Sequence, residues 1–174
     1  MKIEDYALIG DCHSAALVAR DGSIDWLCWP RFDSAACFAA LLGRPEHGRW
    51  RIAPAGVERA VRRRYRGDSL ILETEFETSE GAVTLVDFMP ARTQHCNLVR
   101  MVLGRRGRVK MDLEFIVRFD YGASVPWVTR LPEGREAGYG IRCIAGPDMV
   151  VLRSPVPLQG KDLTTVAQFD VAAG

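Results

Sequence analysis

Apolar and polar side chains alternate along much of this chain, and the longest alternating run covers residues 109–120. Successive side chains of a β-strand point to opposite faces of a sheet, so alternation places one face on a core and the other toward water. The run therefore predicts a long, half-buried strand. Its apolar positions are Val109, Met111, Leu113, Phe115, Val117 and Phe119.

Shorter alternating runs surround sequences that favour turns. Residues 70–77 and 83–88 repeat the pattern on either side of Ser79-Glu80-Gly81, which predicts an antiparallel hairpin. Residues 15–20 and 23–29 flank Asp21-Gly22, a dipeptide suited to the left-handed backbone angles of a tight turn. Further strands are predicted at residues 49–53, 97–103, 139–145, 149–153 and 163–170.

Residues 34–42 break the alternation. Phe38, Leu41 and Leu42 would share one face of a helix, Asp33 or Ser34 could cap its first amides, and Gly43 could end it. We therefore expect a short helix of two or three turns in this segment. Because the strand–helix alternation of a Rossmann-like sheet is absent, the predicted fold class is all-β: an antiparallel β-sandwich with one short helix.

Length and charge exclude several classes of protein. A chain of 174 residues is long enough for one domain with a substantial core. No run approaches the ~20 apolar residues of a membrane span, and the acidic start of the chain lacks the apolar region of a secretory signal. With 23 basic and 22 acidic residues the net charge is +1, too balanced for a dedicated nucleic-acid or membrane binder.

Five cysteines, an odd and unevenly spaced set, predict reduced thiols and a cytoplasmic protein. The pairs Cys12-His13 and His95-Cys96 could supply four zinc ligands, but adjacent residues on a strand point to opposite faces. We expect buried thiols and turn histidines, with no metal. Phosphate-binding loops and nucleophile elbows are also absent, so no cofactor is predicted.

The segment 25–34 concentrates tryptophans, acids and an arginine. Trp29 could form a platform for a sugar ring, with Arg31, Asp33 and Ser34 as groups that bind its hydroxyls. Alternatively, these residues could bury a strand, pair their charges and begin the expected helix. Composition alone favours this second, structural interpretation.

A run of arginines surrounds Tyr65 and could hold phosphates or stack on bases. Alternate residues of a strand point to opposite faces, so the run cannot present all its charges to one partner. We therefore favour a solvated or ion-paired strand. The arginines are Arg59, Arg62, Arg63, Arg64 and Arg66.

Several segments together resemble the N-terminal domain of bacterial glycoside hydrolase family 15 proteins, the glucoamylase-like and trehalase-like enzymes. The resemblance extends over essentially the whole chain. The first matching segments are Ile3–Val18, Arg20–Cys28, Pro30–Ser34 and Phe38–Gly43, and the later ones are Arg63–Arg66, Leu72–Phe76, Asp87–Pro90, Leu98–Arg100 and Arg118–Gly122.

The resemblance implies a large β-sandwich of the supersandwich type. In this family the catalytic glutamates lie in a following α-helical barrel, and nothing here matches it. Residues 1–174 are therefore expected to be a single N-terminal domain without catalytic residues, its final strands missing. The implied partners are the catalytic barrel, which the domain stabilises, and a neutral α-glucoside. Residues 29–34 would shape the rim of the pocket that binds this sugar.

Two other classes of function remain open from the sequence. A self-sufficient carbohydrate-binding module would use Trp29 as its platform. A nucleic-acid or phosphate binder would use the arginine run and would bind in a salt-dependent way.

Overall fold

The computed structural model describes residues 2–57, 60–132 and 138–174, which form strands and short 3₁₀ helices. Among these residues, no helix has the length and hydrophobicity needed to cross a bilayer. The strands are β1 (Ala7–Gly10), β2 (Ala15–Val18), β3 (Ser23–Cys28), β4 (Ala36–Phe38), β5 (Arg49–Pro54), β6 (Arg62–Tyr65), β7 (Leu72–Glu77), β8 (Gly81–Phe88), β9 (Val99–Ile116), β10 (Trp127–Arg130), β11 (Tyr139–Ala145), β12 (Asp148–Ser154), β13 (Gln159–Lys161) and β14 (Thr164–Ala172). The 3₁₀ helices are η1 (Ile3–Asp5), η2 (Ala40–Leu42), η3 (Pro45–His47) and η4 (Asp120–Gly122).

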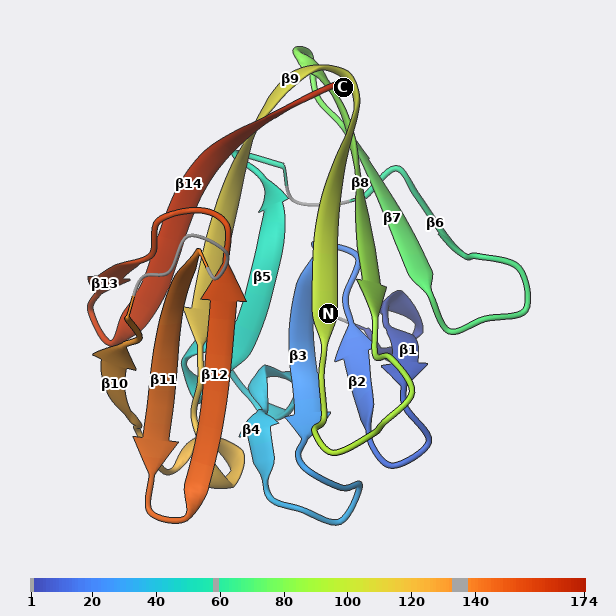
Figure 1. The fold of residues 1–174 in the computed structure, drawn as a ribbon. Coiled ribbons are helices and arrows are strands. Elements are labelled where there is room, and N and C mark those ends of the chain that lie inside the picture. Colours follow the sequence, from blue (N-terminus) through green and yellow to red (C-terminus); the bar gives the residue numbers. More distant parts are fainter. Residues whose placement is uncertain (1, 58–59, 133–137) are drawn as a thin grey trace.

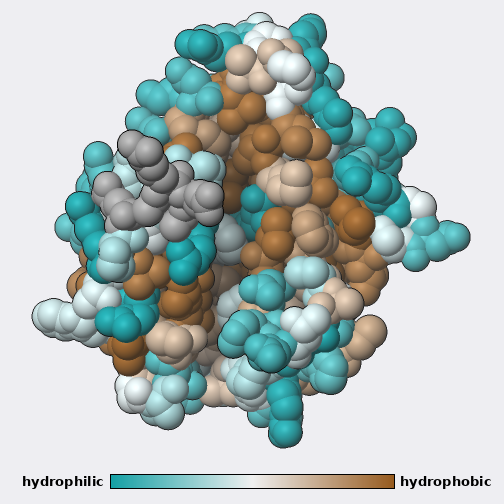
Figure 2. Space-filling model, in the orientation of Figure 1, coloured by the Kyte–Doolittle hydropathy of each residue, from teal (hydrophilic) through white to brown (hydrophobic). Residues whose placement is uncertain are grey.

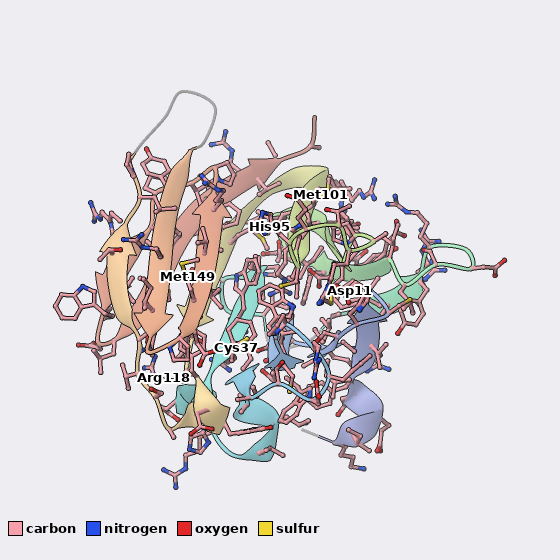
Figure 3. The ribbon with its side chains drawn as sticks, turned by 60° about the horizontal axis from the view of Figure 1, so that its bottom comes forward. Asp11, Cys37, His95, Met101, Arg118 and Met149 are labelled. Carbon is pink, nitrogen blue, oxygen red and sulfur yellow. The ribbon has the colours of Figure 1, made fainter. Side chains whose placement is uncertain are left out.

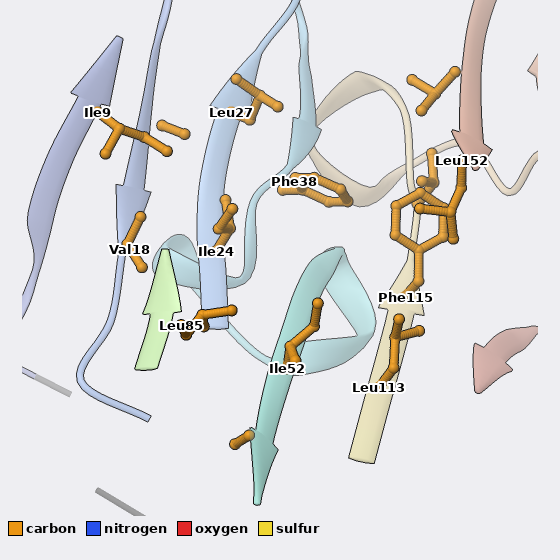
Figure 4. Close-up of a cluster of buried hydrophobic side chains, with 14 of the residues drawn as sticks. Ile9, Val18, Ile24, Leu27, Phe38, Ile52, Leu85, Leu113, Phe115 and Leu152 are labelled. Atoms are coloured by element: carbon orange, nitrogen blue, oxygen red, sulfur yellow. The ribbon is translucent and has the colours of Figure 1, made fainter. Parts of the chain in front are cut away.

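Two antiparallel sheets enclose the core, which confirms the predicted all-β sandwich. The larger sheet has the order β1-β2-β3-β5-β9-β8-β7-β6, with β4 paired to β3 and β14 to β9. It curls, so that β7 and β8 face β1–β3 across one hydrophobic cluster (Figures 1 and 4). The smaller sheet, β10-β11-β12, covers the other half of the curled sheet. Buried residues from both layers include Ile24, Phe38, Leu85, Phe115 and Leu152.

Strand β9 runs through the bend at which the large sheet curls over the core. Its first half pairs with β8, and its second half pairs with β5 on one edge and β14 on the other. The sequence predicts two separate strands here, at 97–103 and 109–120, but the structure joins them across Gly104 and Gly107. A Cβ on Gly104 would lie 2.1 Å from the carbonyl oxygen of Ala172, so only glycine permits this close approach of β14.

The other predicted strands are present within two residues at each end, as β2, β3, β5, β7, β8, β11, β12 and β14. The 79–81 turn joins β7 to β8 as expected. In the β2–β3 connection, residues 19–22, Gly22 takes a left-handed φ of +80° and Asp21 does not. The short strands β1, β4, β10 and β13 were not predicted, because three or four residues carry too little alternation.

The helix predicted over residues 34–42 is wrong in extent. Residues Ala36–Phe38 form β4, and only Ala40–Leu42 make a single 3₁₀ turn, η2. β4 is fully buried and pairs with the edge of β3, with Leu27 opposite Phe38. Tertiary pairing with β3 thus outweighs the local helical pattern. Ser34 is not a helix cap; its Oγ accepts a hydrogen bond from the backbone N–H of Arg31.

A fully buried ion pair connects the two halves of the fold. Asp87 of β8 lies opposite Arg100 of β9, and Arg100 donates to both carboxylate oxygens over 2.8 and 3.2 Å. The same guanidinium donates to the backbone oxygens of Gly22 and Trp50 and lies 5.3 Å from the Trp50 ring. One side chain therefore ties β9 to β8, to β5 and to the β2–β3 connection.

Removal of one member of this pair should leave the other charge buried without compensation. We expect Asp87→Ala to lower the free energy of unfolding by about 3–5 kcal/mol. Urea denaturation followed by circular dichroism measures the loss. Asp33→Ala, which breaks a solvent-exposed ion pair with Arg31, is the matched control and should leave the stability nearly unchanged. Equal losses in the two variants would contradict the central role of the buried pair.

Candidate functional site

Three loops meet at one end of the sandwich, the end that faces the viewer in Figure 3. They are residues 11–14 between β1 and β2, residues 29–35 between β3 and β4, and residues 89–98 between β8 and β9. Backbone contacts join the first two, since the N–H of Phe32 donates to the carbonyl oxygen of His13 over 3.0 Å. We call this the loop end of the domain.

Asp11 organises the loop end. Its side chain is fully buried, and its Oδ1 accepts hydrogen bonds from the N–H groups of His13 and Ser14 at 3.0 and 2.9 Å. Arg92, from the third loop, donates Nε to Oδ2 over 2.8 Å and also donates to the backbone oxygen of Pro30. One carboxylate and one guanidinium thus hold all three loops together.

The charge of Asp11 is stabilised by these donors. Burial alone would raise the pKa of the Asp11 carboxyl, but the amides of Ser14 and His13 and the Arg92 guanidinium lower the pKa below its usual value. A carboxylate that stays ionised and is already surrounded by donors does not supply a proton. Asp11 is therefore an anchor for the loops rather than a general acid.

Of the four predicted site residues, the structure brings three together. Arg31 and Asp33 form an exposed, two-pronged ion pair with an Nε–Oδ1 distance of 2.8 Å, and Ser34 closes the same turn through the Arg31 amide. The Arg31 guanidinium lowers the pKa of the Asp33 carboxyl. Phe32 lies between them with 61% of its surface exposed. These groups can donate to and accept from hydroxyls at a surface, and Phe32 offers an apolar contact.

Trp29, the fourth predicted residue, lies elsewhere. It is half-buried against the hydrophobic core and lines a cleft of about 1040 Å³ rather than the exposed 31–34 turn. Its indole N–H is buried and has no hydrogen-bond partner among the described residues. Trp29 is thus not a free platform for a sugar ring at the loop end.

Sequence reasoning missed Asp11 and Arg92. A local signal exists for Asp11, because Asp-Cys-His-Ser fits a turn in which the carboxylate accepts amides two and three residues later. Nothing local points to Arg92, whose partner lies 81 positions away in the sequence.

The cysteine–histidine pairs do not converge. His13 and His95 are exposed, as is Cys12, while Cys96 is half-buried. In the described part of the chain, no three residues of a metal-binding type lie close enough to share an ion. Burial raises the pKa of the Cys28, Cys37 and Cys143 thiols, for Cys143 to about 11, so these thiols stay protonated at neutral pH.

The arginine run is an ion-paired strand, as its alternation predicts; Arg59 lies outside the described residues. Arg64 and Arg66 both donate to Glu73 of β7, at 2.9 and 2.7 Å. Arg63 points the other way and donates to the carbonyl oxygens of Asp5 and Val18. The run therefore joins β6 to β7 on one face and to the start of the chain on the other.

Comparison with known proteins covers most of the chain. The model of a protein family described as "Trehalase-like, N-terminal" matches residues 1–163. The trehalase of Mycolicibacterium smegmatis is 37% identical over 115 residues, which are 66% of this chain and 17% of that protein. The trehalase of Thermoplasma volcanium is 30% identical over 139 residues, 76% of this chain and 22% of that protein. The chain thus spans about a fifth of the length of these relatives. No solved structure matches it.

The Asp11–Arg92 contact should be pH-dependent. The pKa of Asp11 is lowered in the folded state, so its contribution to stability is complete above the unfolded pKa of about 3.9 and is lost as the pH falls through the folded value. We expect Arg92→Met to raise the pKa of Asp11, read by carboxyl NMR titration. At pH 7 the variant should lose about 1–3 kcal/mol of unfolding free energy.

The loss caused by Arg92→Met should shrink in acid, because protonated Asp11 no longer pairs with Arg92 in the unmodified protein either. Arg106→Met, at an exposed arginine on the bend of β9, is the control. It should change neither the pKa of Asp11 nor the free energy of unfolding. A loss in Arg92→Met that is constant with pH would show that the guanidinium acts by packing alone.

Proposed function

Because this chain belongs to the trehalase-like N-terminal domain family, we propose that it is the non-catalytic N-terminal domain of a trehalase-type α-glucoside hydrolase. Its role is to pack on the catalytic barrel, to stabilise it and to shape the rim of the substrate pocket. The observation that carries the proposal is the family match over residues 1–163, together with relatives that are about five times longer than the segment they share with this chain.

The loop end supports the rim role. Arg31 and Asp33 hold their charged groups at the surface, on a turn that Arg92 fixes through Pro30 and Asp11. A guanidinium and a carboxylate held side by side can bind neighbouring hydroxyls of a neutral sugar. Trehalose is the proposed substrate, because the relatives named above are trehalases.

The geometry favours a docking domain over a self-sufficient carbohydrate-binding module. Such a module needs an exposed aromatic face beside free polar groups. Trp29, which the sequence suggests for this task, is half-buried in the core-lined cleft, and the exposed Phe32 lies between Arg31 and Asp33, which are paired with each other. The charges of Arg31 and Asp33 satisfy each other in the isolated domain. In the longer protein, a second surface would complete the pocket around these two side chains.

We place the protein in the cytoplasm. All five cysteines are free thiols, and three of them are buried in the sandwich. Reduced buried thiols fit a reducing compartment better than an oxidising one.

A trehalase fusion tests the proposal. It joins this chain to the part of the Mycolicibacterium smegmatis trehalase that lies beyond its matched segment. We expect the fusion to release glucose from trehalose and the 174-residue chain alone to release none. Turnover by the chain alone, or an inactive fusion, would contradict the proposal.

The rim role has its own test in the fusion. Arg31→Ala removes a charged hydrogen-bond donor and should raise KM for trehalose about tenfold or more. Arg106→Ala, at the opposite end of the domain, is the matched control and should leave KM unchanged. An unchanged KM in Arg31→Ala would remove the 31–34 turn from the pocket.

A further inference from the structure

The cleft that holds Trp29 is a gap between two strand edges. In Figure 1, β12 lies on one side of the gap and the first half of β9 on the other, and Figure 2 shows hydrophobic residues gathered around a hollow in this face. Consecutive residues line the cleft, 149–156 on one wall and 94–102 on the other. Since alternate side chains of a strand point to opposite faces, an unbroken series of lining residues means that the strands meet the cleft edge-on.

Both edges are unpaired in the described part of the chain. β12 is the last strand of its sheet and pairs only with β11. The first half of β9 pairs with β8 along one edge, and along the other it makes a single bridge, from Gly104 to Ala173. Each edge therefore offers a row of backbone donors and acceptors to the cleft.

The middle of the β12 edge lacks the charges and prolines that protect natural edge strands. Residues 149–152 read Met-Val-Val-Leu, whereas Asp148 and Arg153 lie near the two ends of the strand and Pro155 follows it. Met149 and Val151 are 60% and 42% exposed, and Met101 on the opposite wall is 44% exposed. Such an edge invites a further strand with an apolar face.

The size and polarity of the cleft also favour a polypeptide occupant. Its volume of about 1040 Å³ is at the upper limit of small-molecule sites, which span roughly 300–1,000 Å³. Its lining is mostly apolar and includes the exposed side chains of Met101, Met149 and Val151, so an occupant with an apolar face fits it.

Strand direction and connectivity fit one arrangement. β12 and the first half of β9 run the same way in Figure 1, so a strand running oppositely between them would be antiparallel to both. β14 ends at Ala172 beside Gly104, at the upper end of this gap. Polypeptide that continues from β14 therefore starts next to the cleft, and a tight turn would direct it between the two edges.

We propose that the cleft between β9 and β12 receives a β-strand from the polypeptide that follows this domain in a trehalase-type protein. The strand joins β12 of the small sheet to the first half of β9 in the large sheet and covers Met101, Met149 and Val151. This inference rests on the proposed function, because the occupant comes from the longer protein to which that function assigns the domain.

Amide hydrogen exchange in the trehalase fusion tests the proposal. The amides of β12 should exchange at least about tenfold more slowly in the fusion than in the chain alone. β10, the opposite outer strand of the same sheet, is the internal control, and its amides should exchange within about twofold of their rate in the chain alone. Equal rates for β12 in the two proteins overturn the proposal.

A pair of matched variants separates strand insertion from general stabilisation. Val151→Lys places a charge in the cleft and should abolish the slowing in β12, whereas Val128→Lys, at a similarly exposed valine of β10, should not. The proposal is overturned if β12 amide exchange is still slowed in the Val151→Lys fusion, or if exchange in β10 is slowed equally. Slowing that appears in the chain alone as its concentration rises makes a second copy the occupant and also overturns it.

Activity decides the proposed function independently. A fusion that hydrolyses trehalose while β12 still exchanges rapidly leaves the proposed function standing and overturns the strand insertion. A fusion in which β12 is protected but trehalose is not hydrolysed supports the insertion and contradicts the proposed function.

Discussion

The fold depends on β9 running through the bend of the curled sheet, and the buried pair of Asp87 and Arg100 holds its first half in place. A cross-strand ion pair without solvent contact needs hydrogen-bond partners for its charged groups, and each of the three guanidinium nitrogens of Arg100 has an acceptor, from Asp87 or from two backbone oxygens. Those oxygens belong to β5 and to the β2–β3 connection. One guanidinium thus connects β8 and β9 to β5 and to the β2–β3 connection inside the curl of the large sheet.

The pairing register of β8 and β9 also determines the position of the loop end. β8 ends at Phe88 and β9 begins at Val99, so their pairing sets where residues 89–98 leave the sheet. From there Arg92 reaches the buried carboxylate of Asp11 and holds the 29–35 loop through Pro30. The exposed pair of Arg31 and Asp33 is therefore positioned by two arginine contacts in series, the buried contact of Arg100 and the part-buried contact of Arg92. An end built in this way suits a domain that presents a fixed surface to a neighbour.

Features set by local burial could be predicted from the sequence. Alternation predicted β7, β8 and the second half of β9, because a strand with one buried face must alternate. Features that depend on residues far away in the sequence could not be predicted. The 34–42 segment has a helical pattern, but the edge of β3 takes Ala36–Phe38 as a strand. Likewise, residues 31, 33 and 34 meet in one local turn, whereas the position of Trp29 depends on a cleft formed by strands far apart in the sequence.

Both proposals describe a domain whose surface is completed by the longer protein: the loop end by the substrate pocket and the cleft by a strand. The crystal structure of the trehalase fusion is the most direct test. The account predicts a strand hydrogen-bonded between β12 and the first half of β9, and the turn of Arg31 and Asp33 at the mouth of the barrel. An empty cleft, together with a 31–34 turn that faces solvent away from the barrel, would contradict it.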